Sequence, residues 1–302
     1  MTLSIGIVGL PNVGKSTLFN ALTKAQNAQA ANYPFCTIEP NKAIVPVPDT
    51  RVQALSALVR PQKTIHATVE FTDIAGLVKG ASQGEGLGNQ FLANIRESDA
   101  VMHVVRCFED GDVAHVDGDV DPVRDAEVIE MELILADVQS LERKLERLRK
   151  QTKSGDKQAR ALAATGEGLL AHLNAGQPAL TFSDFRVETA QQLVQELGLL
   201  TAKPVLYCAN VREDELDGNA RHFQALQAYA ATRQARVIPI CAKMEAELAA
   251  LDDQEQAEFL DSYGVQESGI IQVIQTGYTL LGLISYFTAG PKEVRAWTIQ
   301  KG

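Results

Sequence analysis

The segment Gly-Leu-Pro-Asn-Val-Gly-Lys-Ser at residues 9–16 constrains the fold more than any other part of the sequence. It matches the pattern GxxxxGK[ST], it follows the apolar run Ser4–Val8, and it opens a helical stretch, Lys15–Lys24. Between a strand and a helix, this pattern is typical of a loop whose backbone N–H groups cradle the phosphates of a nucleoside triphosphate. We therefore predict a P-loop nucleotide-binding domain.

The residues of this loop have distinct expected roles. Gly14 lets the backbone N–H groups turn toward the phosphates, and Lys15 reaches the β- and γ-phosphate oxygens, where we also expect it to act in catalysis. The hydroxyl of Ser16 is a ligand for Mg²⁺, the expected cofactor. The nucleotide-binding residues predicted in the loop are Asn12, Val13, Gly14, Lys15, Ser16 and Thr17.

Two further segments are expected at the same site. The segment Asp73-Ile-Ala-Gly76 follows the strand-like run Thr68–Thr72 and fits the DxxG turn that senses the γ-phosphate. We expect Asp73 to hold Mg²⁺ through a water molecule, with Gly76 at the turn. Thr37 is placed to give its hydroxyl to Mg²⁺ when a triphosphate is bound, with an ordinary loop threonine as the alternative.

The residue after the DxxG turn is Leu77, where Ras-like enzymes carry a glutamine that orients the attacking water. An apolar side chain cannot orient water, so we expect hydrolysis to be slow or to use another group. His115 is the candidate, because it follows the run Ala100–Arg106 and strand ends carry function in such sheets. A solvated loop histidine is the alternative. His103, inside the run, is expected to pack in the core.

The segment that should contact the base departs from that of ordinary GTPases. Asn210-Val-Arg-Glu213 stands where GTPases carry Asn-Lys-x-Asp. The lysine stem that covers guanine is absent, and the longer Glu213 carboxylate misplaces the fork that accepts hydrogen bonds from guanine. We place Asn210, Val211 and Glu213 at the base, which argues against strict guanine preference but does not by itself establish adenine. Cys241-Ala-Lys243 is expected to lie against the base.

Buried strand-like runs alternate with helical stretches along the chain, which favours an α/β fold, a mainly parallel sheet with helices on both faces. The expected strands are Ser4–Val8, Thr68–Thr72, Ala100–Arg106, Pro204–Ala209 and Arg236–Ile240. An acidic helical stretch at Met244–Leu260 and a helix at Ile270–Leu281 follow them. The last segment, Ile284–Ile299, is typical of a β-hairpin, which must pair with something because a lone hairpin is only marginally stable.

A long insertion between the third and fourth of these strands is predicted to form an antiparallel helical hairpin. Apolar residues at 134, 138, 141, 145 and 148 have the spacing of a coiled-coil seam, and a second amphipathic stretch follows a polar turn at 153–157. Residues 141–160 hold eight basic and three acidic side chains, although the whole chain of 302 residues has a net charge of −10. The charge lies near the tip, so we expect contact with RNA phosphates there rather than packing alone.

No stretch approaches eighteen consecutive apolar residues, and the N-terminus lacks the charged region of a signal peptide. We therefore expect a cytoplasmic protein without a membrane segment. Its four cysteines, none in a CxxC pair, are expected to be reduced.

Four segments closely resemble the YchF family of Obg-like ATPases, at residues 9–20, 32–41, 73–82 and 287–299. The resemblance covers essentially the whole chain. It implies a member of the GTPase superfamily that prefers ATP, with the altered base motif at Asn210, Val211 and Glu213. It also implies a hydrophobic residue in place of the catalytic glutamine at Leu77, and a catalytic histidine at His115.

The resemblance further implies a Ras-like G-domain at residues 1–134 and 198–277 and a helical arm at 135–197. Residues 278–302 would begin a TGS domain, a small β-grasp module, which we expect to be truncated because the chain ends shortly after the first hairpin. Family members are associated with ribosome binding and stress responses. The implied partners are ATP and the ribosome or its RNA, reached through the arm and the TGS domain by a monomer.

Two alternatives to an ATP-hydrolysing ribosome switch stay open at this point. One is a GTPase of ordinary base preference. The other is a nucleotide-gated interaction protein whose hydrolysis is incidental.

Overall fold

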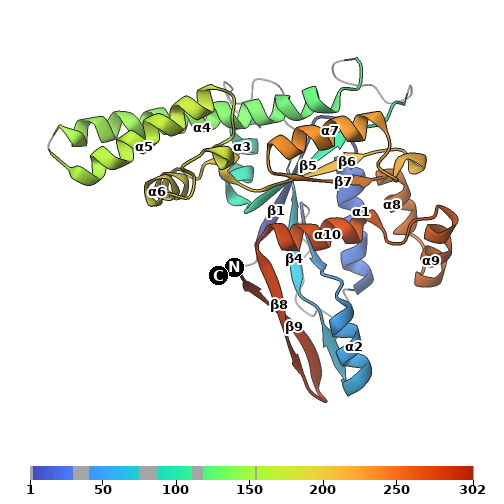
Figure 1. Ribbon diagram of the computed structural model, residues 1–302. Helices are drawn as coiled ribbons and strands as arrows, with labels where there is room; N and C mark the ends of the chain where they lie inside the picture. Colours follow the sequence, from blue (N-terminus) through green and yellow to red (C-terminus); the bar gives the residue numbers. More distant parts are fainter. Residues whose placement is uncertain (1–2, 30–40, 75–86, 111–117, 154, 302) are drawn as a thin grey trace.

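The computed structural model describes residues 3–29, 41–74, 87–110, 118–153 and 155–301, which are organised around two sheets (Figure 1). The larger sheet has the strand order β2-β4-β1-β5-β6-β7. All neighbours in it run parallel except the edge strand β2, which is antiparallel to β4. The α/β fold predicted from the sequence is confirmed. The strands are β1 (Ser4–Val8), β2 (Lys42–Pro46), β4 (Thr68–Asp73), β5 (Ala100–Arg106), β6 (Val205–Asn210) and β7 (Arg236–Ile240).

Helices pack on both faces of this sheet because its strands are apolar on both sides. Along β5 successive side chains enter different cores: Val104 packs into the core that includes α1 and α10, and Val105 into the one that includes α7. The helices of this part are α1 (Lys15–Gln29), α3 (Leu87–Glu97), α7 (Arg221–Thr232), α8 (Ala242–Leu248), α9 (Asp253–Ser262) and α10 (Gly269–Leu280).

The acidic stretch expected as a single helix at Met244–Leu260 is two helices, α8 and α9. Asp252 starts the second one, because its carboxylate accepts hydrogen bonds from the N–H groups of Gln254 and Glu255. The Glu255 carboxylate accepts in return from the N–H of Asp252, at 3.0 Å. This reciprocal capping box satisfies backbone donors that a continuous helix would use differently, so the helix breaks here.

The insertion forms an arm of three helices, α4 (Pro122–Thr152), α5 (Lys157–Asn174) and α6 (Glu188–Leu197), that projects away from the sheet (Figure 1). The predicted seam of α4 is buried against leucines of α5, which confirms the helical hairpin, whereas α6 was not predicted. Gly166 permits the close approach, since a Cβ there would lie 2.8 Å from Leu145 Cδ2. Helix α4 runs unbroken past residue 134, and the division into domains stays a prediction.

A buried carboxylate fastens the arm to the sheet. Asp137 of α4 is fully buried and accepts hydrogen bonds from the backbone N–H groups of Leu200 and Thr201, both at 2.8 Å. The Thr201 hydroxyl donates a third bond, at 2.6 Å. Because these donors lie in the short 3-10 turn Leu200–Ala202 that leads into β6, the carboxylate fixes where the arm leaves the domain.

The smaller sheet has the order β3-β9-β8 and joins distant parts of the chain. Its strands are β3 (Lys63–Ile65), β8 (Leu283–Ala289) and β9 (Glu293–Gln300), and α2 (Thr50–Val59) packs beside it. The predicted hairpin is thus confirmed as β8 and β9, and its partner is β3, which pairs parallel to β9. The hairpin's assignment to a TGS domain stays a prediction.

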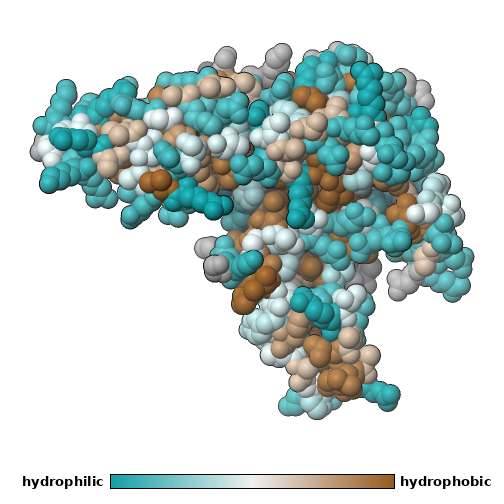
Figure 2. Space-filling view, viewed as in Figure 1, coloured by the Kyte–Doolittle hydropathy of each residue, from teal (hydrophilic) through white to brown (hydrophobic). Residues whose placement is uncertain are grey.

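Apolar and polar residues are distributed differently over the two extensions. Hydrophilic residues cover much of the arm in Figure 2, whereas apolar residues gather around the smaller sheet and α2. The exposed apolar side chains in that part include Leu58, Ile284, Tyr286 and Ile299. In the described part of the chain, no helix is both long and apolar enough to cross a membrane. Cys107, Cys208 and Cys241 are buried free thiols.

Candidate nucleotide-binding site

The loop between β1 and α1 needs glycine at two positions. A Cβ on Gly9 would lie 2.4 Å from the carbonyl oxygen of Val104. Gly14 has a φ of +100°, and a Cβ there would lie 2.4 Å from Asn210 Nδ2. The tight packing and the positive φ both exclude a side chain, so the loop conformation follows directly from these residues.

Lys15 begins α1 and is half-buried beside the loop. Its Nζ donates a 2.6 Å hydrogen bond to the carbonyl oxygen of Leu10. Burial lowers the pKa of Lys15, and the nearby Asp73 carboxylate opposes that shift. A desolvated ammonium group at the start of a helix is a strong electrostatic attractant for phosphate oxygens.

Asp73 ends β4, directly beside the strand that leads into the loop. It lies opposite Ile7 in the parallel pair of β1 and β4, and its N–H donates to the carbonyl oxygen of Asn41 at 2.9 Å. Burial raises the pKa of the Asp73 carboxyl, and Lys15 counteracts this. The parallel register therefore places Asp73 at the end of the sheet from which the loop to Lys15 starts.

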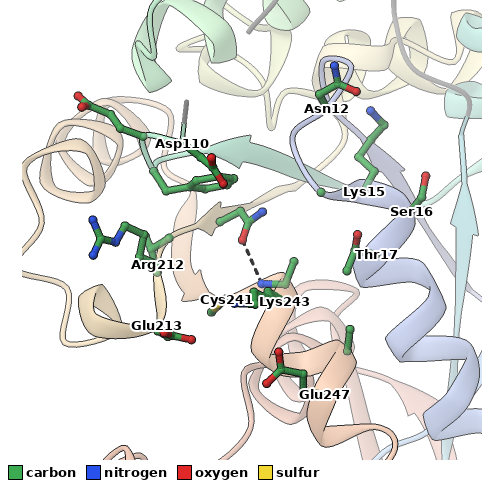
Figure 3. Close-up of a pocket in the computed structure, with 17 residues that line it drawn as sticks. Asn12, Lys15, Ser16, Thr17, Asp110, Arg212, Glu213, Cys241, Lys243 and Glu247 are labelled. Carbon is green, nitrogen blue, oxygen red and sulfur yellow. Dashed lines mark hydrogen bonds between the residues drawn. The ribbon is translucent and has the colours of Figure 1, made fainter. Parts of the chain in front are cut away.

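A cavity of about 970 Å³ opens in front of the loop. Figure 3 shows Asn12, Lys15 and Ser16 in one part of it and Arg212 and Glu213 in another, where β6 ends. This space suits a ligand with phosphates at one end and a planar group at the other. The predicted nucleotide-binding residues that line it are Asn12, Gly14, Lys15, Ser16, Thr17, Asn210, Val211 and Glu213.

Asn210, expected to contact the base, is buried and its amide holds backbone groups in place. Its Nδ2 donates to the carbonyl oxygen of Val13 at 2.9 Å, and its Oδ1 accepts from the N–H of Ala242 at 3.0 Å, the dashed line in Figure 3. The side chain therefore ties the phosphate loop to the start of α8. Val13 itself is buried and contributes this carbonyl rather than a lining side chain.

The sequence analysis missed the contribution of the segment after β5. Arg106 is almost fully buried, and its guanidinium donates to the carbonyl oxygens of Phe108 and Asp110 at 3.0 and 3.1 Å. It also lies 4.7 Å from the centre of the Phe108 ring, which lines the cavity. Arg106 lies in an otherwise apolar strand, and a buried guanidinium needs hydrogen-bond partners nearby. That requirement could have pointed to the residues that follow β5.

Four predicted site residues lie outside the described residues: Thr37, Gly76, Leu77 and His115. His103, in contrast, is described and buried in β5, with its ring 5.3 Å from that of Tyr207. Burial, with a smaller effect of Lys15, lowers the pKa of His103 to about 3, so it is a neutral core residue at physiological pH.

The donor atoms near the loop fit Mg²⁺. The Ser16 hydroxyl lines the cavity, and the Asp73 carboxylate is close enough to Lys15 to interact with it electrostatically; both groups are hard oxygen donors of the kind that Mg²⁺ prefers. The described residues contain no group of three or more His, Cys, Asp or Glu side chains placed to hold a metal ion. Mg²⁺ in nucleotide sites is commonly held by only one or two protein oxygens, because phosphates and waters supply its other ligands.

The fold and this loop together define a P-loop nucleotide-binding protein. A family described as "50S ribosome-binding GTPase" matches residues 4–136. The chain is 52% identical over 303 residues to "Ribosome-binding ATPase YchF" of Haemophilus influenzae and 53% identical over 305 residues to that of Bacillus subtilis. Each alignment covers 100% of this chain and 82% of the relative.

A solved structure gives the same result. The Schizosaccharomyces pombe protein described as "YchF GTPase" has a TM-score of 0.87 and 38% identity, over 100% of this chain and 81% of that one. The chain therefore belongs to the YchF family.

Proposed function

We propose that this chain binds ATP together with Mg²⁺, hydrolyses it slowly, and uses its nucleotide state to control association with the ribosome. The observation that carries the proposal is the cavity that runs from Lys15 to Glu213, with a phosphate loop at one end and no Asn-Lys-x-Asp motif at the other. Relatives that match the whole chain are named ribosome-binding ATPases. We place the protein in the cytoplasm.

Binding uses groups that are already positioned. The backbone N–H groups at Gly14 and the start of α1 hold phosphate oxygens, and Lys15 exchanges its bond to the Leu10 carbonyl for the β- and γ-phosphates. Ser16 and, through water, Asp73 would hold Mg²⁺, with Thr37 joining them when the triphosphate is bound. Mg²⁺ supplies charge neutralisation on the phosphate oxygens.

Hydrolysis needs a group that positions water. Leu77 carries no polar atom for this, so we assign the role to His115, and we keep Gly76 as the turn that senses the γ-phosphate. In this arrangement the backbone and Lys15 supply most of the electrostatic stabilisation, and His115 orients the attacking water.

Phosphate release from ATP tests this assignment. Lys15→Ala is expected to lower both nucleotide affinity and turnover, the latter by at least about 100-fold. His115→Ala is expected to lower turnover while the affinity for a fluorescent ATP analogue stays within twofold. Unchanged turnover in His115→Ala with intact binding would refute the catalytic role of this histidine.

GTP is the second candidate substrate. The Schizosaccharomyces pombe relative is described as a GTPase, and Asn210 keeps the position that the first residue of the GTPase base motif has. The buried amide of Asn210 serves the loop regardless of the base, so it does not discriminate between ATP and GTP. Discrimination then falls on Val211, Glu213 and the segment after β5.

Ribosome association is assigned to the arm and to the segment at 278–302. Residues 141–160 carry eight basic and three acidic side chains, which gives the arm an affinity for RNA phosphates that the acidic chain as a whole lacks. Co-sedimentation with ribosomes is expected to weaken steeply as salt rises. Pelleting that does not depend on salt would contradict an electrostatic role of the arm.

A further inference from the structure

The short helix α8 faces the nucleotide-binding cavity on one side and α10 on another. Ala242 and Ala246 line the cavity, whereas the carboxylate of Glu245 is bonded to the start of α10. Seven residues are too few for a helix to be stable by itself, so contacts with its neighbours decide where α8 lies. The position of this wall of the cavity is therefore set by the bonds that α8 makes.

Glu245 is a buried carboxylate, only 5% exposed, that accepts two short hydrogen bonds. One comes from the backbone N–H of Gly269 at 2.7 Å, and the other comes from the hydroxyl of Ser268 at 2.6 Å. Burial raises the pKa of the Glu245 carboxyl, and the bonds from Ser268 and Gly269 oppose that shift. Because a buried carboxylate costs desolvation energy that an apolar side chain does not, its contribution here is the direction of its bonds.

The two donors to this carboxylate fix the first residues of α10. Ser268 is the N-cap residue, and its hydroxyl accepts from the N–H of Ile270 at 3.2 Å while it donates to Glu245. Gly269 has no room for a side chain, because a Cβ would lie 2.8 Å from Ile240 Cγ1 and 3.1 Å from Glu245 Oε1. Glu245 therefore joins α8 to α10 at the point where β7 ends.

On the cavity side, α8 is bonded to the phosphate loop through Asn210. The N–H of Ala242 donates to Asn210 Oδ1 at 3.0 Å, and Asn210 Nδ2 donates to the carbonyl oxygen of Val13 at 2.9 Å. The N–H of Glu245 donates to the carbonyl oxygen of Cys241 at 3.0 Å, which closes the first turn of α8. A continuous set of hydrogen bonds thus runs from the phosphate loop through one turn of α8 to the start of α10.

Helix α10 lies beside the larger sheet and leads into the hairpin β8–β9 (Figure 1). A Cβ on Gly277 would lie 2.5 Å from Ile5 Cδ1, so α10 packs closely on β1, the strand that leads into the phosphate loop. The hydroxyl of Tyr278 lies 3.2 Å from the carbonyl oxygen of Ile284 in β8 and 3.1 Å from Thr298 Oγ1 in β9. Since a closely packed helix moves as a unit, a shift at the start of α10 is carried to the hairpin.

We propose that Glu245 is a positioning residue for nucleotide recognition, and that α10 transmits the occupancy of the cavity to the hairpin β8–β9. Glu245 does not itself line the cavity; it acts through α8, whose first turn forms part of the wall. A nucleotide that contacts this wall favours the arrangement in which α8, α10 and the hairpin are bonded together. The inference rests on the proposed function only in that the cavity binds a nucleoside triphosphate, and it holds for either base.

Binding of a fluorescent ATP analogue, and of the corresponding GTP analogue, to the full chain tests the positioning role. Glu245→Ala leaves the N–H of Gly269 without its acceptor, and we expect the affinity for the analogue to fall about tenfold. Turnover at saturating nucleotide is expected to stay within about twofold, because the phosphate end of the cavity is unchanged. Unchanged affinity in Glu245→Ala would overturn the positioning role.

Two further variants separate positioning from a general loss of stability. Glu245→Gln keeps an acceptor for Gly269, and its amide can donate to Ser268 Oγ, so we expect an affinity within about threefold of the wild type. Asp137→Ala removes another buried carboxylate that accepts from two backbone N–H groups, but in the arm. We expect Asp137→Ala to bind within about twofold of the wild type, although the chain is less stable. An equal loss of affinity in Asp137→Ala would show that Glu245 acts through stability alone, and would overturn the proposal.

Amide hydrogen exchange of the hairpin tests the transmission. With Mg²⁺ and a non-hydrolysable ATP analogue, the amides of β8 and β9 are expected to exchange at least about threefold more slowly than in the free chain. The slowing is expected to disappear in Glu245→Ala at saturating nucleotide. It is also expected to disappear in Tyr278→Phe, which removes the hydroxyl at the other end of α10 and leaves the cavity intact. Exchange that does not respond to nucleotide in the wild type, or slowing that persists in either variant, would contradict transmission through α10.

The outcomes distinguish this inference from the proposed function. If the wild type bound the GTP analogue and not the ATP analogue, the ATP preference would be wrong. A loss of GTP-analogue affinity in Glu245→Ala would then still support the positioning role. If the wild type bound neither analogue, both proposals would be overturned. If the wild type hydrolysed ATP while Glu245→Ala bound it equally tightly, only the inference about Glu245 would fail.

Discussion

The phosphate loop and helix α4 of the arm both present positive charge, but they are built in opposite ways. In the loop, one half-buried lysine stands beside backbone fixed by Gly9 and Gly14, where an added Cβ would lie 2.4 Å from a neighbouring atom. On α4, Arg143, Arg147 and Arg149 are exposed along a single long helix. A rigid loop gives specificity through position, whereas a row of exposed charges gives affinity that depends on salt.

The first way to break this comparison is to disturb the rigid loop. Gly14→Ala places a Cβ against Asn210 Nδ2 at a φ of +100°. We expect ATP affinity, measured by isothermal titration, to fall at least about 100-fold, or about 2.7 kcal/mol. Gly155→Ala is the matched control: its φ is +87°, but no atom lies within 4 Å of the added Cβ. If Gly155→Ala lost as much ATP affinity as Gly14→Ala, the loss could not be assigned to the phosphate loop.

The second prediction concerns the buried attachment of the arm. Asp137→Ala leaves the N–H groups of Leu200 and Thr201 without their acceptor inside the protein. We expect the free energy of unfolding in urea to fall by about 2 kcal/mol. The exposed Asp184→Ala is expected to cost less than about 0.5 kcal/mol, and equal costs would show that Asp137 does not hold the arm.

The cost of Asp137→Ala should also depend on pH. Burial raises the pKa of the Asp137 carboxyl above its ordinary value of 3.8, so the folded chain holds this proton more tightly than the unfolded chain. Its contribution to stability is fully present below pH 3.8 and declines as pH rises through the raised pKa. The difference between wild type and variant is therefore expected to narrow as pH rises, and a widening would contradict the shift.

The third prediction concerns the base end of the cavity. Phe108→Ala removes the ring that Arg106 holds against the cavity. We expect ATP affinity to fall about tenfold, or about 1.4 kcal/mol, with little change in turnover at saturating ATP. Phe182→Ala, on the arm, is expected to leave ATP affinity unchanged. If both variants bound ATP with equal affinity, Phe108 would not contribute to ATP binding.

The smallest effect is expected at the exposed surface of the arm. The pair of Arg149 and Glu167 spans 3.3 Å, with both side chains more than half exposed, at 58% and 55%. Arg149→Gln is expected to change the free energy of unfolding by less than about 0.5 kcal/mol. A loss comparable to that of Asp137→Ala would show that surface charges, and not buried contacts, stabilise the arm.

The sequence predicted local features well and distant pairings poorly. The strands Ser4–Val8, Ala100–Arg106 and Arg236–Ile240 have the predicted bounds, because continuous apolar runs mark buried parallel strands. Strand β3 was missed, since three residues carry no clear pattern and its partner β9 lies more than two hundred residues away. Pairing at that distance depends on the completed fold.

The site shows the same division. The glycines and Lys15 were predictable from their spacing, because the loop geometry is set by neighbouring residues. The bridging role of Asn210 was not, since it depends on where Val13 and Ala242 lie after folding. The position of α6 was also beyond prediction: the charge of α4 was visible in the sequence, but α6 and its Glu196, which binds Lys144 of α4, were not expected beside it.

The central claim is that this cavity binds ATP in preference to GTP. Competition of ATP and GTP for a labelled nucleotide, with Mg²⁺ present and both competitors titrated side by side, tests it most directly. The account predicts that ATP displaces the label at the lower concentration. Displacement by GTP at a tenfold lower concentration than ATP would contradict it.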